Sequence, residues 1–398
     1  MAKRTGGFIG QDGINAPDPA TGVTGTAGDT SVSVAFTAPT DVGGSAVTGY
    51  RVQSNDGIGA SGSASPITVS GLTNGTSYTF NVWAINPFGW SSPSDASGSV
   101  APVETRIGLF FRNYTVQQIN IASTGDATNF GTLDFGYGRA GAGAWGSSTR
   151  AFVGGGNFNG TAEINTLTYA SGGSSTDYGD MNPQRYQYGA LSNSTRGICA
   201  GGLDNTATGT TTIQYGTIAS TGSFSSFGNL TRASSGNGSG GASSTRGLFF
   251  GGTLVDSPYY SNRIEYVTIA STGNAATFGN LSGVTADNGD GASNSTRSVM
   301  GIAKTSSPVA FSNAIQYVTI ASTGNAADFG DLTVARGSQA ATGDSIRAVW
   351  MGGNDSNGDT DTIDYVTFST LGNAADFGDL TGGSSLGAAT SDSHGGLQ

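Results

Sequence analysis

Apolar and polar residues alternate in short runs through the first hundred residues of the chain. Four runs show this period of two: residues 31–36, 48–54, 66–69 and 77–85. A period of two is typical of β-strands with one buried face, and clusters of Gly, Pro, Asn and Asp separate these runs as turns do. Residues 16–102 are therefore predicted to form a small antiparallel β-sandwich.

A repeated pattern replaces this simple alternation from about residue 104 onwards. Each unit opens with an arginine, continues with a short apolar run and a loop, and then alternates again before a Phe-Gly turn. The arginines are spaced by 44, 46, 50, 51 and 50 residues: Arg106, Arg150, Arg196, Arg246, Arg297 and Arg347. A period of about 50 residues with four short strands is typical of a β-propeller blade. The sequence thus predicts an all-β chain with a six-bladed β-propeller over residues 104–398.

The ends of the repeat array predict how the ring closes. In the fourth unit we expect strands at residues 239–243, 247–250, 264–270 and 277–281. The first unit has no strand before its arginine, whereas residues 385–393 supply one after the sixth unit has ended. Because closure hides the edges of a sheet, we expect this C-terminal strand to pair with the unit at residues 106–133.

Composition and charge exclude several classes of protein. Charged residues make up only 11% of the chain, too few for long amphipathic helices with charged outer faces. The net charge is −11 and Lys and Arg form no stripe, so nucleic acid is not an expected partner. No apolar run reaches 18 residues, and residues 1–13 lack the apolar core of a secretory signal. We expect synthesis in a host cytoplasm and an exit by another route, such as release inside a virus particle.

The sandwich segment resembles the fibronectin type III family. Residues 72–78 (Leu-Thr-Asn-Gly-Thr-Ser-Tyr) look like its tyrosine corner, in which the hydroxyl group of the tyrosine, here Tyr78, bonds back to the preceding loop. Residues 82–93 resemble its sixth strand and the turn into the seventh. Phe36 stands where the family usually has a core Trp, a swap of similar volume. The resemblance implies a spacer or a weakly adhesive domain.

The repeat array is similar to kelch-type propellers over about three quarters of the chain. A glycine pair ends the second predicted strand of four units, at residues 155–156, 201–202, 251–252 and 352–353. The first and fifth units lack this pair, and the kelch spacing of Tyr and Trp is not reproduced, so the array is kelch-like.

Two sequence motifs of the repeat are Tyr-Val-Thr-Ile-Ala-Ser-Thr-Gly-Asn-Ala and Asp-Phe-Gly-Asp-Leu. They resemble motifs in virion proteins of tailed phages, especially cyanophages, and residues 1–9 are also similar to the start of such proteins. This resemblance implies a virion structural or adhesion protein, tail fibre-like or capsid-decorating. The alternative is a bacterial extracellular carbohydrate-binding or adhesion protein.

Few residues are suited to catalysis. The chain has one histidine, His394, which we expect to be a variant of the repeat arginine in the closing strand. It has three glutamates, and most aspartates recur in equivalent turns, where carboxylates normally cap backbone N–H groups. We therefore predict no enzymatic activity and no bound cofactor.

Two sets of polar residues suggest binding sites. The six repeat arginines would bind anions if they faced the ring axis, but we favour bonds to backbone carbonyls or to Asp and Asn of their own or a neighbouring blade. Oxygen ligands alternate in one loop: Asp355, Asn357, Asp359 and Asp361. This spacing is similar to the start of a calcium loop, and the alternative is a solvated hairpin turn.

The Gly-rich residues 1–15 have too few apolar residues to form a core. They are either a disordered terminus or an arm that orders on a partner. In the second case, four residues would make the contacts: Lys3, Arg4, Phe8 and Ile9. The partners would be other virion proteins for the arm, and a host cell-surface glycan or protein for the propeller.

Overall fold

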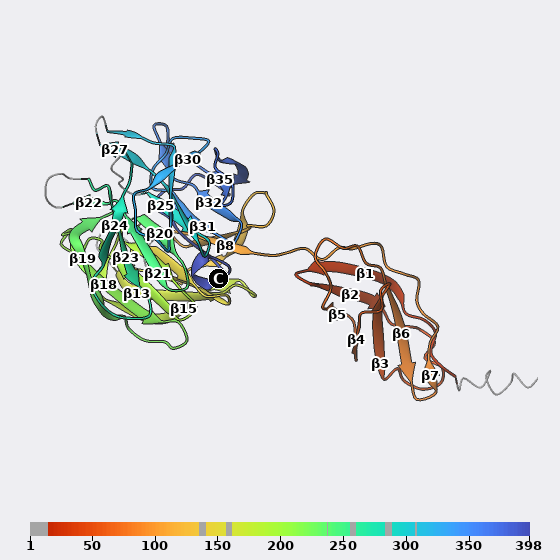
Figure 1. Ribbon diagram of the computed structural model, residues 1–398. Helices are drawn as coiled ribbons and strands as arrows, with labels where there is room; N and C mark the ends of the chain where they lie inside the picture. The colour runs from red at the N-terminus through yellow and green to blue at the C-terminus, as the bar shows by residue number, and fades with distance from the viewer. Residues whose placement is uncertain are drawn as a thin grey trace, which may run out of the picture. The chain divides into compact units, whose positions relative to one another are not determined.

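The computed structural model describes residues 15–134, 141–156, 161–236, 238–254, 260–282, 289–306 and 309–398. The chain consists of two compact units, unit 1 (Met1–Thr105) and unit 2 (Arg106–Gln398) (Figure 1). The predicted all-β class is confirmed, because the described residues contain one helical segment, the 3-10 helix η1 (Gly395–Leu397). The predicted arm residues lie outside the described residues: Lys3, Arg4, Phe8 and Ile9.

Unit 1 is a sandwich of two antiparallel sheets. The first sheet has the order β1 (Thr21–Gly28), β2 (Ser31–Thr37) and β5 (Ile67–Ser70). The second has the order β4 (Gly59–Gly62), β3 (Gly49–Ser54), β6 (Phe80–Asn86) and β7 (Gly89–Trp90). The alternating runs of the sequence correspond to β2, β3, β5 and β6, whose inward residues build the core. The sequence analysis missed β1 and β4, since they contain mainly Gly, Thr, Ala and Ser.

The predicted tyrosine corner is present in unit 1. The hydroxyl oxygen of Tyr78 accepts a hydrogen bond from the N–H of Thr73 at 3.1 Å. Phe36 is only 8% exposed and packs on Tyr50, with 4.7 Å between the ring centroids. Phenylalanine therefore takes the place of the usual tryptophan within the core.

Serines at every third position saturate the edge of β6 beyond β7. Each serine donates its N–H to the carbonyl of one β6 residue, and its hydroxyl oxygen accepts the N–H of that same residue. All six distances are 2.9–3.0 Å, for the pairs Ser91 with Ala84, Ser94 with Val82 and Ser97 with Phe80. An edge paired in this way is closed to another strand.

Replacing Ser94 with alanine should weaken this edge. Ser94→Ala leaves the buried N–H of Val82 without an acceptor, and an orphaned buried donor costs about 1–3 kcal/mol. Hydrogen–deuterium exchange of β6 should then be faster in the full chain. The control Ser92→Ala changes an exposed side chain and should leave the exchange unchanged. Equal exchange in both variants would show that the Ser94 hydroxyl group is dispensable.

The described part of unit 2 contains six large sheets, each with four main antiparallel strands that run in order from the inner to the outer edge, and two small hairpins. Sheet 1 is β37 (Ala388–Ser391), β8 (Ile107–Arg112), β9 (Thr115–Asn120) and β10 (Thr128–Thr132). Sheet 2 is β11 (Gly143–Gly146), β12 (Arg150–Gly154), β13 (Thr161–Thr168) and β15 (Thr176–Arg185). Sheet 3 is β16 (Gly189–Ser192), β17 (Arg196–Ala200), β18 (Thr210–Thr217) and β19 (Ser225–Ser235).

The other three sheets repeat this order. Sheet 4 is β20 (Gly238–Ala242), β21 (Arg246–Phe250), β23 (Arg263–Thr268) and β24 (Ala276–Asn280). Sheet 5 is β25 (Asp290–Ser293), β26 (Arg297–Gly301), β29 (Ala314–Thr319) and β30 (Ala327–Asp331). Sheet 6 is β31 (Ala340–Gly343), β32 (Arg347–Met351), β35 (Thr362–Thr367) and β36 (Ala375–Asp379). Short additions are β14 (Gly173–Ser174), β22 (Thr253–Leu254), and the hairpins β27 (Lys304–Ser306) with β28 (Val309–Phe311) and β33 (Asn354–Asp355) with β34 (Gly358–Asp359).

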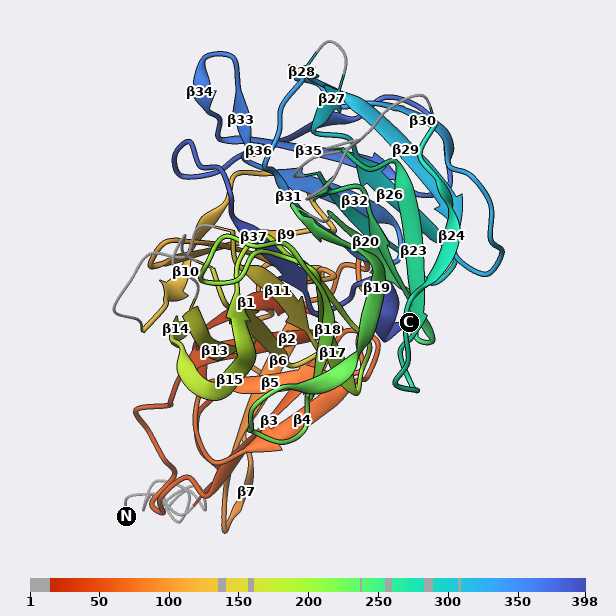
Figure 2. The same cartoon turned by 90° about the vertical axis from the view of Figure 1, so that its left-hand side faces the viewer.

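The inner strands follow one another in a cycle. Contacts run from β37 to β11, β16, β20, β25, β31 and back to β37. Figure 2 shows β20, β31 and β37 in the middle of unit 2, with β24 and β30 at its rim. The C-terminal strand β37 pairs with β8 in the register Ala388 to Phe111, as expected from the sequence. The first sheet is thus assembled from both ends of unit 2.

Neighbouring sheets share their hydrophobic cores. One cluster joins Leu248 and Phe250 of sheet 4 to Met300 and Val318 of sheet 5. The second strand of each sheet is covered on both faces, so β21 buries Leu248, Phe249 and Phe250 in succession. Burial on two faces explains why these strands are continuously apolar rather than alternating.

Candidate functional site

The repeat arginines join adjacent sheets through backbone carbonyls. Guanidinium groups donate to the residue after the third strand of the next sheet, for the pairs Arg150 with Ile218, Arg196 with Ile269 (2.9 Å), Arg246 with Ile320 (2.7 Å), Arg297 with Phe368 and Arg347 with Ile121 (2.9 Å). The last pair joins sheet 6 to sheet 1. Arg106 bonds to Asp344 of sheet 6 at 2.8 Å. These contacts are of the kind expected for a structural role.

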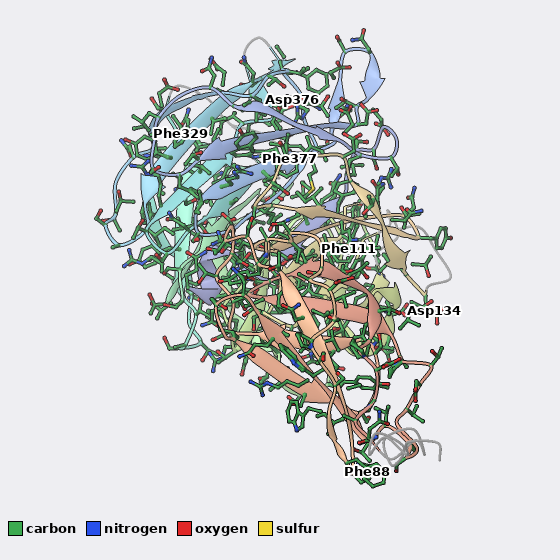
Figure 3. The ribbon with its side chains drawn as sticks, turned by 90° about the vertical axis from the view of Figure 1, so that its right-hand side faces the viewer. Phe88, Phe111, Asp134, Phe329, Asp376 and Phe377 are labelled. Atoms are coloured by element: carbon green, nitrogen blue, oxygen red, sulfur yellow. The ribbon has the colours of Figure 1, made fainter. Side chains whose placement is uncertain are left out.

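Stacked rings hold four of these guanidinium groups in place. Arg347 lies over Tyr365 at 4.9 Å from the ring centroid, and Tyr365 meets Phe377 edge-on at 5.8 Å. The same arrangement recurs in sheet 5 with Phe329; both phenylalanines are labelled in Figure 3. Arg196 and Arg246 repeat it in sheets 3 and 4. This Arg–Tyr–Phe stack explains why the repeat keeps these residues at fixed spacing.

The Ser-Thr-Gly-Asn-Ala phrase of the repeat forms a second set of contacts between sheets. Gly324 and Ala326 of sheet 5 donate to the carbonyls of Phe278 and Asn280 on β24, at 2.9 and 2.8 Å. The backbone approaches so closely that a Cβ on Gly279 would lie 1.9 Å from the carbonyl oxygen of Gly324. Equivalent bonds join sheets 2–3, 3–4, 5–6 and 6–1, and β14 pairs with β10 between sheets 1 and 2. All six junctions of the cycle are therefore bonded at their outer edge.

A partial ring of backbone hydrogen bonds runs around the axis at the start of the inner strands and links five of the six sheets. The N–H of each residue donates to the carbonyl of its counterpart in the preceding sheet, at 2.7–3.0 Å, in the chain Gly236 to Gln187 to Gly141 to Leu386 to Ser338. All five residues have φ between +52° and +70°, the left-handed region. Three of them are not glycine and hold this conformation at a cost of about 1–3 kcal/mol each.

An axial cavity lies inside this ring. It has a volume of about 100 Å³, and residues from all six sheets line it. Most of the lining is Gly and Ala, and the polar lining residues are Gln187, Tyr188, Ser239, Asp290, Ser338 and Gln339. A second space of about 40 Å³ shares part of this lining and reaches His394. The six repeat arginines are not among the described residues that line either space.

The C-terminal residues close the inner end of the cavity. His394 caps the 3-10 helix η1, and a Cβ on Gly396 would lie 1.8 Å from the carbonyl oxygen of Ser192. The expectation that His394 belongs to the closing strand was wrong, because β37 ends at Ser391 and the chain then turns across the axis. Strand β8 begins at Ile107, next to the partner of Ser391, so a strand that continued beyond Asp392 would have no partner in β8.

His394 and Ser192 do not form a nucleophile and base pair, although Nε2 lies 3.2 Å from the serine hydroxyl oxygen. Nδ1 accepts the N–H of Gly396 at 3.2 Å, so in the neutral ring the proton is on Nε2. Nε2 donates to the carbonyl of Gly146 at 3.1 Å. Burial lowers the pKa of His394 to about 4, which keeps the ring neutral. A protonated Nε2 cannot accept the proton of Ser192.

Asp290 is the acidic residue of the cavity wall. Its carboxylate accepts the N–H groups of Gly291 at 3.0 Å and Ala341 at 2.9 Å. Burial nevertheless raises its pKa to about 7, and these backbone bonds only oppose the shift. The carboxyl group is therefore only partly ionised near neutral pH.

The raised pKa predicts how Asp290 affects stability. Between about pH 4, the ordinary pKa of an aspartate, and about pH 7, the folded state keeps a proton on Asp290 that the unfolded state has already released. The stabilising effect of this proton therefore disappears as the pH rises through this interval. The melting temperature of Asp290→Ala should therefore rise relative to the wild type between about pH 5 and about pH 8. Calorimetry at several pH values measures this difference, and a constant difference would contradict the burial of the carboxylate.

The predicted calcium loop is the β33–β34 hairpin. Asp355 accepts the N–H of Asn357 at 2.6 Å and also bonds to its side-chain amide. Asp359 ends the hairpin in β34 and Asp361 follows it. Within the part of the chain that the structure describes, no three His, Cys, Asp or Glu residues are grouped to hold a metal ion. Calcium binding by this hairpin stays a prediction.

The sequence analysis missed the polar residues of the axial cavity. Asp290 stands where the other units have Gly or Ala, so an alignment of the units would have singled it out as an unusual polar residue. No comparable signal marks Gln339, since it precedes a strand of small residues. None of the described helical residues forms a segment long and apolar enough to cross a membrane.

Comparison with known proteins identifies unit 1. Residues 16–99 match the model of the fibronectin type III domain. Unit 1 contains a fibronectin type III domain. The chain is 33% identical over 171 residues to chitinase A1 of Niallia circulans, a match that covers 41% of this chain and 22% of the chitinase. It is also similar to domains A168–A170 of titin, at 33% identity, a TM-score of 0.22, and coverage of 22% and 33% of the two chains.

Proposed function

We propose that unit 2 is a six-bladed, kelch-like β-propeller closed by the C-terminal strand. The contacts between sheets support this proposal because they go all the way round the axis. The inner strands contact one another in a cycle, and the outer edges are hydrogen-bonded at six junctions. Five arginines also donate hydrogen bonds to the next sheet. Pairing of β37 with β8 joins the two ends of the unit. A closed ring exposes no full-length sheet edge.

The proposed function of the chain is that of a non-enzymatic virion structural or adhesion protein. It is tail fibre-like or capsid-decorating, with residues 1–15 docking on the particle and the propeller contacting a host surface or a neighbouring protein. The fibronectin type III domain supports an adhesion or binding role. The observation that carries the proposal is the wall of the axial cavity, which offers the polar groups of Asp290, Gln339 and Ser239 for binding.

A bacterial extracellular carbohydrate-binding protein is the second candidate. The similarity to chitinase A1 favours it, although the chain spans only 22% of that protein. Both candidates predict binding, and they differ in where the chain is found.

Binding to cells tests the adhesion role. Fluorescently labelled full-length chain should bind saturably to the bacteria that the particles infect, and unlabelled chain should displace it. Binding that does not saturate, or that is absent from these cells, would overturn the role in adhesion.

The docking role of the arm gives a separate prediction. A chain without residues 1–15 should fold normally but be lost from particles, because Phe8 and Ile9 supply the adjacent apolar pair and burial of each contributes about 1.5–3 kcal/mol. Changing both to serine should reproduce most of the loss, while Lys3 and Arg4 should matter little at moderate salt. Quantitative proteomics of particles measures incorporation. Normal incorporation of the shortened chain would assign docking to another part.

A further inference from the structure

One position breaks the small-residue lining of the axial cavity. Asp290 begins β25 and pairs with Gly301 of the second strand. The residues that begin the other five inner strands are Gly or Ala: Gly143, Gly189, Gly238, Ala340 and Ala388. Five of the six sheets thus have no carboxylate at the start of the inner strand. Asp290 is therefore not required by the fold of the repeat.

A second polar group beside it lacks a partner. Gln339 lines the same cavity and is 3% exposed, and neither its amide nitrogen nor its amide oxygen has a hydrogen-bond partner in the protein. A buried amide without partners costs free energy, so such groups normally meet a ligand or an ordered water. Gln339 and Asp290 line this cavity from the adjacent sheets 6 and 5.

The wall has the chemistry of a site for hydroxyl groups. A carboxylate has about four acceptor positions, and the N–H groups of Gly291 and Ala341 occupy two on Asp290, which leaves acceptor positions for a ligand. Gln339 can donate and accept, and Ser239 adds a hydroxyl group. Tyr188 and Leu386 supply apolar surface. The described lining residues include no Lys or Arg, so an anionic ligand would meet Asp290 without compensation.

We propose that the axial cavity binds a single neutral sugar residue at the end of a glycan. One sugar hydroxyl donates to Asp290, a second pairs with the amide of Gln339, and a ring face lies against Tyr188. The volume of about 100 Å³ suits one small molecule rather than a polymer segment. The helix η1 packs on the inner strands β16, β20 and β25. The proposal rests on the adhesion role and names the ligand class that this role requires.

Saturation-transfer difference NMR of the full chain tests the proposal. The probes are galactose, mannose and N-acetylglucosamine, with N-acetylneuraminic acid as the anionic sugar. At least one neutral sugar should receive saturation, with a Kd of about 1 mM, and the anionic sugar should not. Asp290→Ala and Gln339→Ala should each weaken binding at least about tenfold, the loss expected when one hydrogen-bonding partner is removed.

A matched control separates the cavity from general effects of charge. Asp328→Ala removes an exposed carboxylate from the outer strand β30 and should leave sugar binding unchanged. Asp290→Ala should fold, because Ala340 and Ala388 occupy the equivalent positions. Circular dichroism and melting of each variant verify this.

Three results would overturn the proposal. They are the absence of saturation of every neutral sugar, equal affinity in the wild type and Asp290→Ala, and a rise in melting temperature with calcium chloride that needs Asp290. Cell binding keeps the two claims distinct: if Asp290→Ala binds cells as the wild type does, the sugar site fails and adhesion stands. If neither protein binds cells, the adhesion role fails.

Discussion

Deletion of residues 385–398 should open the ring of unit 2 and cause a large loss of stability. The deletion removes β37, which covers the edge of β8, and η1, which closes the axis. It uncovers Leu109, Phe110 and Phe111, each at most 1% exposed. Because a domain of this kind is stable by only about 5–15 kcal/mol, we expect much of this total to be lost. Calorimetry should show a far lower melting temperature, and size-exclusion chromatography should show aggregates.

Deletion of residues 1–14 is the matched control. It removes a segment of the same length, and the melting temperature of unit 2 should stay within the error of the measurement. If the two shortened chains melt alike, or if the chain without residues 385–398 remains monomeric and stable, the ring does not depend on closure by β37.

Asp364→Ala should be among the most destabilising single substitutions. The carboxylate pairs with Arg336 at 2.7 Å, and both side chains are fully buried. Asp364 also accepts the hydroxyl group of Thr333 at 2.5 Å. Removing one partner of a buried ion pair leaves the other charge without compensation and costs about 3–5 kcal/mol. Calorimetry and chemical unfolding of unit 2 in the full chain measure the loss.

A double variant shows whether the loss comes from the stranded charge. In sheet 5 the position equivalent to Asp364 is occupied by the neutral Gln316. Its side-chain oxygen accepts the N–H of Ser282 at 2.8 Å. We therefore expect Arg336→Met combined with Asp364→Gln to recover most of the stability. A single variant as stable as the surface variant Asp328→Ala would contradict the importance of this pair.

The sheets of unit 2 were predictable because the same pattern of an arginine, an apolar run and an alternating run recurs in each repeat. Short apolar runs after each arginine became β12, β17, β21, β26 and β32, and the missing first strand pointed to the C-terminus. The bonding partners of the arginines were not predictable to the residue. The acceptor carbonyls lie 68 or more residues away in the chain, such as Ile269 for Arg196, and are defined only by the packing of adjacent sheets.

The axial cavity was the least accessible part of the molecule to sequence reasoning. Its wall is built mainly from Gly, Ala and Ser, and these small residues form no sequence pattern that predicts a binding site. The left-handed residues Gln187, Ser338 and Leu386 carry no turn signature of their own, because the inter-sheet ring imposes their conformation. The turn of the chain at His394 likewise depends on space at the axis, which no local pattern encodes.

We propose that this chain is a binding module carried on a phage particle. The most direct measurement is quantitative mass spectrometry of particles purified by density gradient from the culture that produces the chain. We expect the chain to co-sediment with the major capsid protein at a constant copy ratio across the particle peak. Absence from the particles, with the chain found instead in the bacterial envelope or the culture medium, would contradict it.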